Sequence, residues 1–459
     1  MKKIIIALVI VIAAIAVLPI LGNSVAEEVL QERIDIITSN GIELKNEKSE
    51  SSYLNTKKHY ELLLSDAPKF MAYLDKYSDA QIPPYVEAMI AGVVVGIDIK
   101  YSNFPLSTKV IVDIYPLTMP TNMMQELKKE DMNFYTYVDK LLQSKGILYH
   151  INYYLSDDLF VGYIKNIDEE YSFDNGSKMK FSLLDATYHG EGPIIAPKDL
   201  HTNISKIEVQ IGDSKQNLLL EMNDLRSAST FESQSTYAAS ATLNSMLLIT
   251  KDSKNSNIEM SLDTLKINAS SNAQGEKVEF NAKSSLGELK FNSPEANVVA
   301  TGFNYDISLD GVDKVAYEEF RKITSHSKAN YSDGVEKKVQ ESITKLVSKG
   351  LSLSVADLSV AKLSIENKKP IDGFSMMAKV VVSEDADLAN KLNQNPMLAS
   401  KNFNIASTLK FSKEFYAMIN QVTPMTSMAN SLAKEDGNNV IFKIILNDGH
   451  ISVNDKVMK

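Results

Sequence analysis

The residues best suited to metal or acid–base chemistry are His189 and Glu191, which flank Gly190. Side chains two residues apart share a face on a strand, and His201 follows later in the chain. The sequence has no H-E-x-x-H helix, the motif that brings two histidines to one zinc ion. Gly190 and the pair Gly192-Pro193 predict a loop or bend here. We therefore interpret this cluster as an exposed turn and predict no metal site.

Other signatures of catalysis are missing from the sequence. It has no G-x-S-x-G elbow, no S-x-x-K with matching partners, and no cysteine. The glycines of the run 92–101 do not have the spacing of a phosphate-binding loop, so this apolar run predicts a buried strand. The remaining histidines stand singly, at positions 59, 150, 326 and 450. We predict no catalytic, cofactor-binding or metal-binding residues and no enzymatic activity.

The charge of the chain argues against nucleic acid as a partner. Its net charge is −10 and its pI about 5.3, with both signs interspersed. Nucleic-acid binding needs a positive field that releases counterions from phosphates. Arginine occurs only at positions 33, 226 and 321, which also argues against bidentate phosphate or carboxylate clamps.

The N-terminus predicts a membrane segment. After Met-Lys-Lys, residues 4–21 are apolar and uncharged, long for a signal-peptide core and short for a spanning helix. Ser24-Val25-Ala26 has the form of a cleavage site, so cleavage stays an alternative to the uncleaved anchor that we favour. Lys2 and Lys3 would remain in the cytoplasm. We expect a single-pass protein of the bacterial inner membrane with the bulk of the chain in the periplasm.

The elements that follow are mostly strands, and 299–309 is the clearest of them. A period of two is typical of a strand with one apolar face. The residues expected to share that face are Val299, Thr301, Phe303, Tyr305, Ile307 and Leu309. Within 258–269 the apolar positions change phase, which predicts a bulge or a sharp bend, and a similar slip occurs within 351–365. Such bends would curl a sheet.

Short polar connectors between the strands favour antiparallel pairing, because parallel crossovers need a dozen or more residues. Further strands are predicted at 42–48, 54–64, 92–101, 108–115, 147–155, 158–166, 179–184, 204–211, 217–222, 236–250, 256–269, 277–282, 286–291, 351–365, 373–383 and 402–411. Helices are predicted at 26–38, 66–77, 121–145, 312–324, 333–349, 385–393, 412–420 and 425–434. Asp448-Gly449 predicts a closing hairpin.

Together these patterns predict an α+β, β-dominated fold. We expect elongated, curved antiparallel sheets with several short helices, preceded by one N-terminal transmembrane helix. The expected organisation is an anchor or signal segment at 1–26, a mixed α/β region at 27–146, an antiparallel β-rich region at 147–311, and a helix-plus-strand region at 312–459 that continues the sheet.

Several of these features resemble the YdgA-like family of bacterial envelope proteins, a domain of unknown function. They are the N-terminal apolar segment, the early strand pair KNEKSESSYLNTKKHYELLL, the corner Tyr101-Ser102-Asn103-Phe104-Pro105-Leu106, the unit LVSKGLSLSVADLSV at 346–360, and the closing NDGHISVND hairpin. The tail departs from the family's N-G-K, since Asp455-Lys456 follow Asn454. The resemblance implies an inner-membrane-anchored envelope protein and carries no catalytic residues to transfer.

Three classes of function remain. The favoured one is a membrane-tethered periplasmic structural or interaction protein. The alternative is a binder or carrier of lipid or another hydrophobic ligand, since a curled sheet with an apolar inner face can enclose an acyl chain. The third is an envelope hydrolase with residues dispersed in sequence. We expect the membrane as a partner through residues 4–21, leave lipid and self-association open, and expect no cofactor.

Overall fold

The computed structural model describes residues 34–458 except 75–86, 88–89, 104–108, 193–196, 214–215, 234, 253–256, 327–332, 367, 395 and 423–426. It is β-dominated, with 61% strand, antiparallel pairing and several short helices, as predicted. The expected anchor, 4–21, and most of the helix expected at 26–38 lie outside the described residues. The chain forms two units, Met1–Phe231 and Glu232–Lys459, and the division falls within the segment 147–311.

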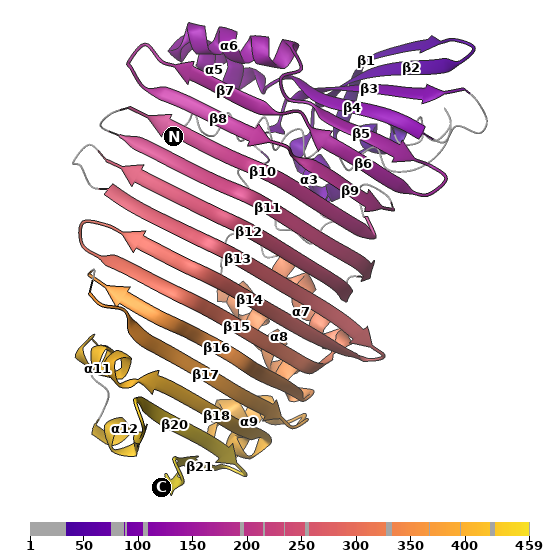
Figure 1. Ribbon diagram of the computed structural model, residues 1–459. Helices are drawn as coiled ribbons and strands as arrows, with labels where there is room; N and C mark the ends of the chain where they lie inside the picture. Colours follow the sequence, from indigo (N-terminus) through magenta and orange to yellow (C-terminus); the bar gives the residue numbers. More distant parts are fainter. Residues whose placement is uncertain are drawn as a thin grey trace. The chain divides into compact units, whose positions relative to one another are not determined.

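The first unit begins with a meander in which each strand pairs antiparallel with the next (Figure 1). Its strands are β1 (Ile42–Ser51), β2 (Asn55–Leu64), β3 (Val94–Ser102), β4 (Lys109–Thr118), β5 (Tyr149–Tyr154) and β6 (Leu159–Ile164). The strand β3 confirms that the apolar run 92–101 is a strand and not a nucleotide-binding loop.

Beyond β6 the sheet branches. Strand β6 pairs with β9 (Thr187–Glu191), and β9 pairs with the first part of β10 (Asp199–Gly212). The second part of β10 pairs instead with β8 (Lys178–Leu184), which continues to β7 (Ile167–Ser172). Strand β11 (Asn217–Ser233) pairs with β10 over the whole length of β10. The sequence patterns predicted neither β7 nor β9.

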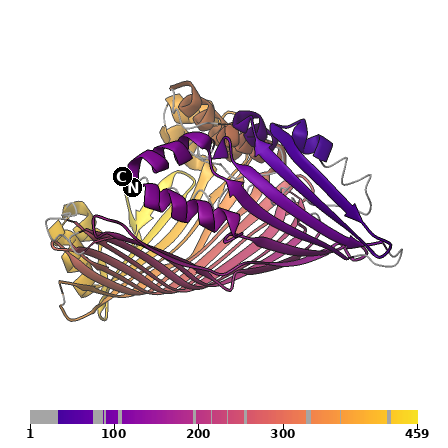
Figure 2. The ribbon, with the colours of Figure 1, turned by 90° about the horizontal axis from the view of Figure 1, so that it is seen from above.

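Three helices accompany these strands: α3 (Ala67–Leu74), α5 (Thr121–Glu130) and α6 (Met132–Gln143). The single helix expected at 121–145 is wrong, because Asp131 adopts an extended conformation between α5 and α6. Its carboxylate accepts a hydrogen bond from the Phe134 backbone N–H at 2.9 Å and so caps the second helix. Figure 2 shows α5 and α6 lying against one face of the strands.

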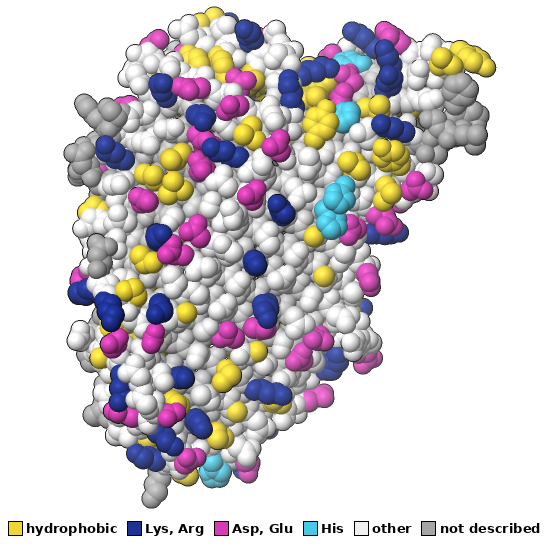
Figure 3. All heavy atoms as spheres, viewed as in Figure 1, with side chains coloured by type: hydrophobic (Ala, Val, Ile, Leu, Met, Phe, Trp, Pro, Cys, Tyr) yellow, Lys and Arg dark blue, Asp and Glu magenta, His cyan; other side chains and the backbone are white. Residues whose placement is uncertain are grey.

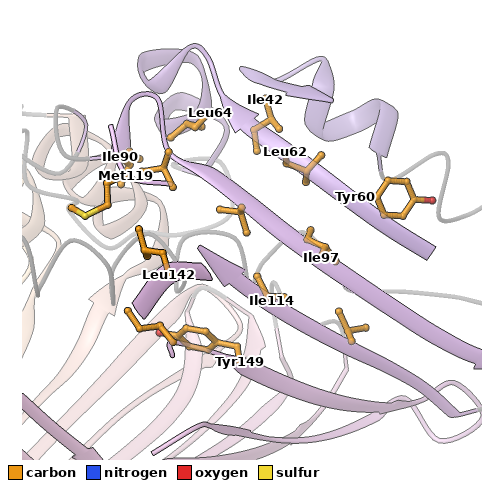
Figure 4. Close-up of a cluster of buried hydrophobic side chains, with 14 of the residues drawn as sticks. Ile42, Tyr60, Leu62, Leu64, Ile90, Ile97, Ile114, Met119, Leu142 and Tyr149 are labelled. Carbon is orange, nitrogen blue, oxygen red and sulfur yellow. The ribbon is translucent and has the colours of Figure 1, made fainter. Parts of the chain in front are cut away.

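The first unit has a continuous hydrophobic core between its strands and helices. Strands β2 to β5 contribute alternate residues, and α6 contributes Phe134, Val138 and Leu142 at helical spacing. Figure 4 shows this cluster, including Tyr60, Ile97, Ile114, Leu142 and Tyr149, which are all at most 2% exposed. This core packs the strands and helices of the first unit against each other.

The second unit is an antiparallel meander of long strands (Figure 1). Its strands are β12 (Thr236–Lys251), β13 (Asn257–Gln274), β14 (Lys277–Asn292), β15 (Asn297–Asp313), β16 (Leu351–Ile365), β17 (Ile371–Val382), β18 (Phe403–Ser412), β19 (Lys434–Asp436), β20 (Asn439–Asn447), β21 (His450–Val453) and β22 (Lys456–Val457). The two strands expected at 277–282 and 286–291 are one strand, β14.

Short helices occupy the connections between these strands. Helices α7 (Lys314–His326) and α8 (Asp333–Ser348) lie between β15 and β16 in sequence, and α9 (Leu388–Gln394) and α10 (Pro396–Ala399) lie between β17 and β18. Helices α11 (Lys413–Val422) and α12 (Ser427–Leu432) precede β19. The hairpin between β20 and β21 turns at Asp448 and Gly449, whose φ angles are 48° and 77°. Two positive φ angles are what a tight hairpin turn requires, so this prediction is confirmed.

The predicted phase changes are real and have identifiable causes. Thr264 has a φ of 57°, which interrupts the alternation of β13 within 258–269 as expected. The pairings of β13 with β12 and β14 skip one residue on each strand, so the cause is a local bend and not a bulge with an extra residue. The pairing of β16 with β17 shifts between Val355 and Leu358, where the sequence indicated a slip. Bulges of this kind bend a strand and increase its twist.

The stripe expected in 299–309 is correct only from Phe303 onward. Gly302 has a φ of 63°, so the odd-numbered and even-numbered residues of β15 exchange faces at this position. Direct partners across neighbouring strands share a face. Thr301 lies between charged residues of β14 and β16, whereas Ala300 lies between two leucines. Ala300 therefore continues the apolar stripe of Phe303, and Thr301 belongs to the opposite face.

Candidate functional site

The histidine–glutamate cluster singled out in the sequence lies on a strand and not in a turn. His189, Gly190 and Glu191 belong to β9, and His201 on β10 is the direct partner of His189. Gly190 does not mark a bend, and it instead allows a neighbouring strand and ring to approach the backbone of β9 closely. A Cβ there would lie 2.2 Å from the Asp199 carbonyl oxygen and 2.5 Å from a Phe160 ring atom. The strand therefore needs glycine at this position.

A second group of titratable residues, not anticipated from the sequence, crosses the meander of the first unit. His59, Asp98, Asp113 and His150 are successive direct partners on β2, β3, β4 and β5, so they share one face. His59 Nδ1 lies 2.6 Å from Asp98 Oδ1, and His150 Nδ1 lies 2.7 Å from Asp113 Oδ1. We call these four residues the His–Asp row. No sequence motif could reveal it, because its members are separated by the chain and joined only by strand register.

Two further side chains compensate the charge of Asp98. Lys145 Nζ lies 2.5 Å from Asp98 Oδ2, and the Tyr115 hydroxyl donates to the same oxygen at 3.0 Å. Burial opposes ionisation of Asp98, but the hydrogen bonds from Lys145, His59 and Tyr115 outweigh it and hold the pKa of this carboxyl below its ordinary value. Lys145 also lies 3.9 Å from the centre of the Tyr115 ring. Lys145 therefore compensates the charge of Asp98, which lies directly opposite the like charge of Asp113.

The His–Asp row lacks the parts of a hydrolytic site. Among the described residues, neither histidine of the row has a serine or threonine hydroxyl at hydrogen-bond distance that could act as a nucleophile. In the same part of the chain, no three His, Cys, Asp or Glu side chains are gathered so that they could hold a metal ion. The row contains two His–Asp contacts, one between β2 and β3 and one between β4 and β5.

The most extensive distinctive surface belongs to the second unit, where direct partners form apolar rows across eight strands. We call the side of the sheet that carries these rows the apolar face. One row is Leu243, Leu265, Leu286, Phe303, Val360, Phe374, Phe411 and Val440. The next row is Ala241, Ile267, Ser284, Tyr305, Leu358, Met376, Leu409 and Phe442.

The opposite side of the same sheet, which we call the polar face, is built from different residue types. The row offset by one residue is Thr242, Lys266, Ser285, Asn304, Ser359, Ser375, Lys410 and Ile441. Figure 3 shows Lys, Asp and Glu side chains scattered over β12 to β20 on this side, with few hydrophobic ones between them. The sheet is therefore amphipathic, with one face suited to water.

The apolar face is only partly covered. Of the two apolar rows, Leu243, Ser284, Val440 and Phe442 are buried, whereas the other members retain some exposure, up to 37% for Ile267. Helix α11 covers one end, where the Phe415 ring centre lies 5.6 Å from that of Phe374. The described residues of the second unit contribute one buried cluster of three core residues, beside a much larger core in the first unit.

This distribution is unusual for a folded unit of this size. A domain of about 200 residues normally buries most of the apolar surface of its chain, and a contiguous apolar patch on a soluble surface commonly marks a binding site. Ser407 adds a polar anomaly on the same face, between Ala378 and Ile444. Its Oγ is buried and has no hydrogen-bond partner among the described residues. The apolar face is the candidate functional site.

The described residues contain no helix that is long and apolar enough to cross a membrane. Comparisons of the chain with protein-family models, with curated proteins and with solved structures found no match. The resemblance to the YdgA-like family therefore stays a prediction, and the argument for function rests on the geometry of the apolar face.

Proposed function

We propose that the protein binds lipid, or another ligand with a long hydrocarbon part, on the apolar face of its second unit. The observation that carries the proposal is the alignment of partly exposed apolar side chains in continuous rows across eight strands. The sequence left this function as the alternative to a structural or interaction role, and the uneven burial of the two units favours it. The proposal assigns no reaction to the protein.

The dimensions of the apolar face suit an acyl chain. Neighbouring strands lie about 4.8 Å apart, so the seven spacings from β12 to β20 extend for about 34 Å. This length exceeds half of the hydrocarbon thickness of a bilayer, about 15 Å, which one acyl chain spans. Each methylene group removed from water contributes roughly 0.8 kcal/mol. An acyl chain that lies along several rows would therefore gain several kcal/mol of binding free energy, even if the protein covers only one of its sides.

The chemistry of the face favours a lipid tail over a polypeptide. A peptide brings backbone N–H and C=O groups that cost free energy when they are buried without partners. The two apolar rows offer such groups little, since their only hydroxyl-bearing side chains are Ser284 and Tyr305. The strands that carry the rows already use their backbone groups in pairing with each other. A hydrocarbon tail needs no hydrogen-bond partner.

The proposal keeps the cellular setting expected from the sequence. Residues 4–21 would anchor the protein in the bacterial inner membrane, with residues 27–459 in the periplasm. Such a tether would hold the apolar face near a supply of lipid.

Adjacent residues on opposite faces provide the test. Leu358 lies in an apolar row and Ser359 in the polar row. Three cultures would express the parent chain, the Leu358→Asp variant or the Ser359→Asp variant. Each culture would be given a photoactivatable long-chain fatty acid and illuminated. Adducts on residues 232–459 would then be counted by mass spectrometry. We expect the parent chain and Ser359→Asp to be labelled on residues of the apolar face. Leu358→Asp should carry at least tenfold fewer adducts on these residues than the parent chain.

Labelling confined to residues 1–26, or equal labelling of both variants, would reject the proposal. Circular dichroism of the purified variants provides the control, since both must keep the strand content of the parent chain. If the apolar face takes up no lipid and instead forms crosslinks to another protein, the structural or interaction role is favoured.

A further inference from the structure

The exposed face of β9 and β10 holds four side chains of metal-binding type. His189 and His201 are direct partners, and Glu191 and Asp199 are direct partners two residues further along the same two strands. Because direct partners share a face and the strand period is two, all four side chains project from the same side of the sheet. They occupy the corners of a two-by-two arrangement. Figure 3 shows histidine side chains forming a contiguous patch at the level of β9.

The two imidazole rings are already in contact. Their centres lie 4.6 Å apart and their planes differ by 6°, so the rings are stacked in parallel. His201 Nε2 lies 3.0 Å from Asp199 Oδ1, and the His201 side chain is 41% exposed. Among the described residues, neither ring nitrogen of His189 has a hydrogen-bond partner. One imidazole is therefore oriented by a carboxylate, and the other is available to a ligand.

The contact with Asp199 determines which nitrogen of His201 can bind. A neutral imidazole that donates from Nε2 to a carboxylate carries its lone pair on Nδ1. A carboxylate that holds the second nitrogen of a metal-bound histidine is a common supporting arrangement in metal sites. Asp199 is placed to give this support to His201, and Glu191 is placed to supply an oxygen ligand.

We propose that His189 and His201 together bind a divalent transition metal ion of the Cu²⁺, Ni²⁺ or Zn²⁺ class. Imidazole nitrogen is a preferred ligand of these ions, whereas Ca²⁺ and Mg²⁺ prefer oxygen. The His189 ring must rotate about its χ2 torsion so that one of its nitrogens and His201 Nδ1 converge on one ion at about 2.0–2.1 Å, while His201 keeps its contact with Asp199. Such terminal torsions are broad and the rings are exposed, so the rotation is easy.

The site forms on binding and is not prearranged, since no group of three ligands is gathered for a metal ion among the described residues. The two imidazoles supply the chelate, and Glu191 or water completes the coordination. His59 and His150 are poorer candidates for a shared ion, because β3 and β4 separate them. The proposal concerns the first unit alone and does not depend on lipid binding.

Titration of the untagged full chain with CuCl₂, NiCl₂ or ZnCl₂ tests the proposal. At pH 7.5 we expect one equivalent to bind, most tightly for Cu²⁺ by the general affinity order of these ions. His189→Ala and His201→Ala should each weaken this binding at least tenfold. His450→Ala, which removes a histidine from the β20–β21 hairpin, should leave it unchanged.

Electron paramagnetic resonance of the Cu²⁺ complex gives a second readout that does not depend on stability. We expect hyperfine structure from two imidazole nitrogens in the parent chain and from at most one in either single variant. Unchanged metal affinity in both variants, a spectrum without two nitrogens, or equally tight binding of CaCl₂ would overturn the proposal.

Discussion

Phe303 and Asn304 are adjacent in β15 but lie on opposite faces of the sheet. Substituting each residue in turn therefore tests the contribution of one face at a time. Phe303 lies between Leu286 and Val360, and its ring centre is 6.3 Å from that of Tyr305. Removing a fully buried phenylalanine costs about 3–5 kcal/mol. Phe303 keeps part of its surface exposed, so we expect Phe303→Ala to cost about 2 kcal/mol in the absence of lipid.

Asn304 provides the matched control. It lies between Ser285 and Ser359 on the polar face, and its side chain donates only to the nearby Gly302 carbonyl oxygen at 3.3 Å. We expect Asn304→Ala to cost less than about 1 kcal/mol, as most surface substitutions do.

Hydrogen–deuterium exchange of peptides from β15 and β16 measures both costs locally. A loss of 2 kcal/mol corresponds to roughly 30-fold faster exchange. Lipid that binds the folded state should slow exchange in the parent chain and in Asn304→Ala, and less so in Phe303→Ala. Equal effects at positions 303 and 304 would refute the assignment of faces.

Three further predictions address the backbone, the His–Asp row and the buried serine. Gly302→Ala should lower the thermal midpoint more than Gly437→Ala, although both glycines have positive φ. A Cβ at position 302 would lie 2.8 Å from the Ala361 Cβ, whereas a Cβ at position 437 would meet no atom within 4 Å. Equal losses would show that only backbone strain, which costs about 1–3 kcal/mol, matters at both positions. The lowered pKa of Asp98 means that its charge stabilises the fold above the ordinary carboxyl pKa of about 3.9 and that this stability is lost as pH falls. Asp98→Asn should therefore flatten the fall in melting temperature between about pH 5 and pH 3, and an unchanged fall would contradict this. Ser407→Ala should be neutral or stabilising by up to about 1 kcal/mol in a denaturant titration, because it removes a buried hydroxyl without a partner; a clear loss of stability would mean that Ser407 has a hydrogen-bond partner.

Local chemistry made much of the strand content predictable. Long alternating runs such as 236–250 and 351–365 correspond to β12 and β16, and the phase change within 258–269 correctly indicated the interrupted alternation at Thr264. The elements that were missed have weak local signals. Strand β9 is short and contains Gly190, which is required by the approach of a neighbouring strand and ring. Pattern reasoning could not distinguish that requirement from a turn.

The candidate site depended on register, which the sequence did not reveal. The alternation in 299–309 predicted an apolar face but not the change at Gly302, because a positive φ depends on the neighbouring strands as well as on the glycine. The pairing of His189 with His201 and the His–Asp row are likewise cross-strand relations. The partial exposure of the apolar face could not be read from residue types, since the same residues would also make an ordinary core.

The most direct test of lipid binding places a photoreactive amino acid on each face of β15. Ile307 lies in an apolar row between Ala282 and Val355, whereas Asp306 on the other face forms an ion pair with Lys283 at 3.1 Å. The full chain with a benzophenone side chain at either position would be illuminated in cells, purified and weighed by intact mass spectrometry. We expect position 307 to acquire adducts with the masses of cellular lipids and position 306 to acquire none. Lipid adducts at both positions, or at neither, would contradict the proposal that the apolar face binds lipid.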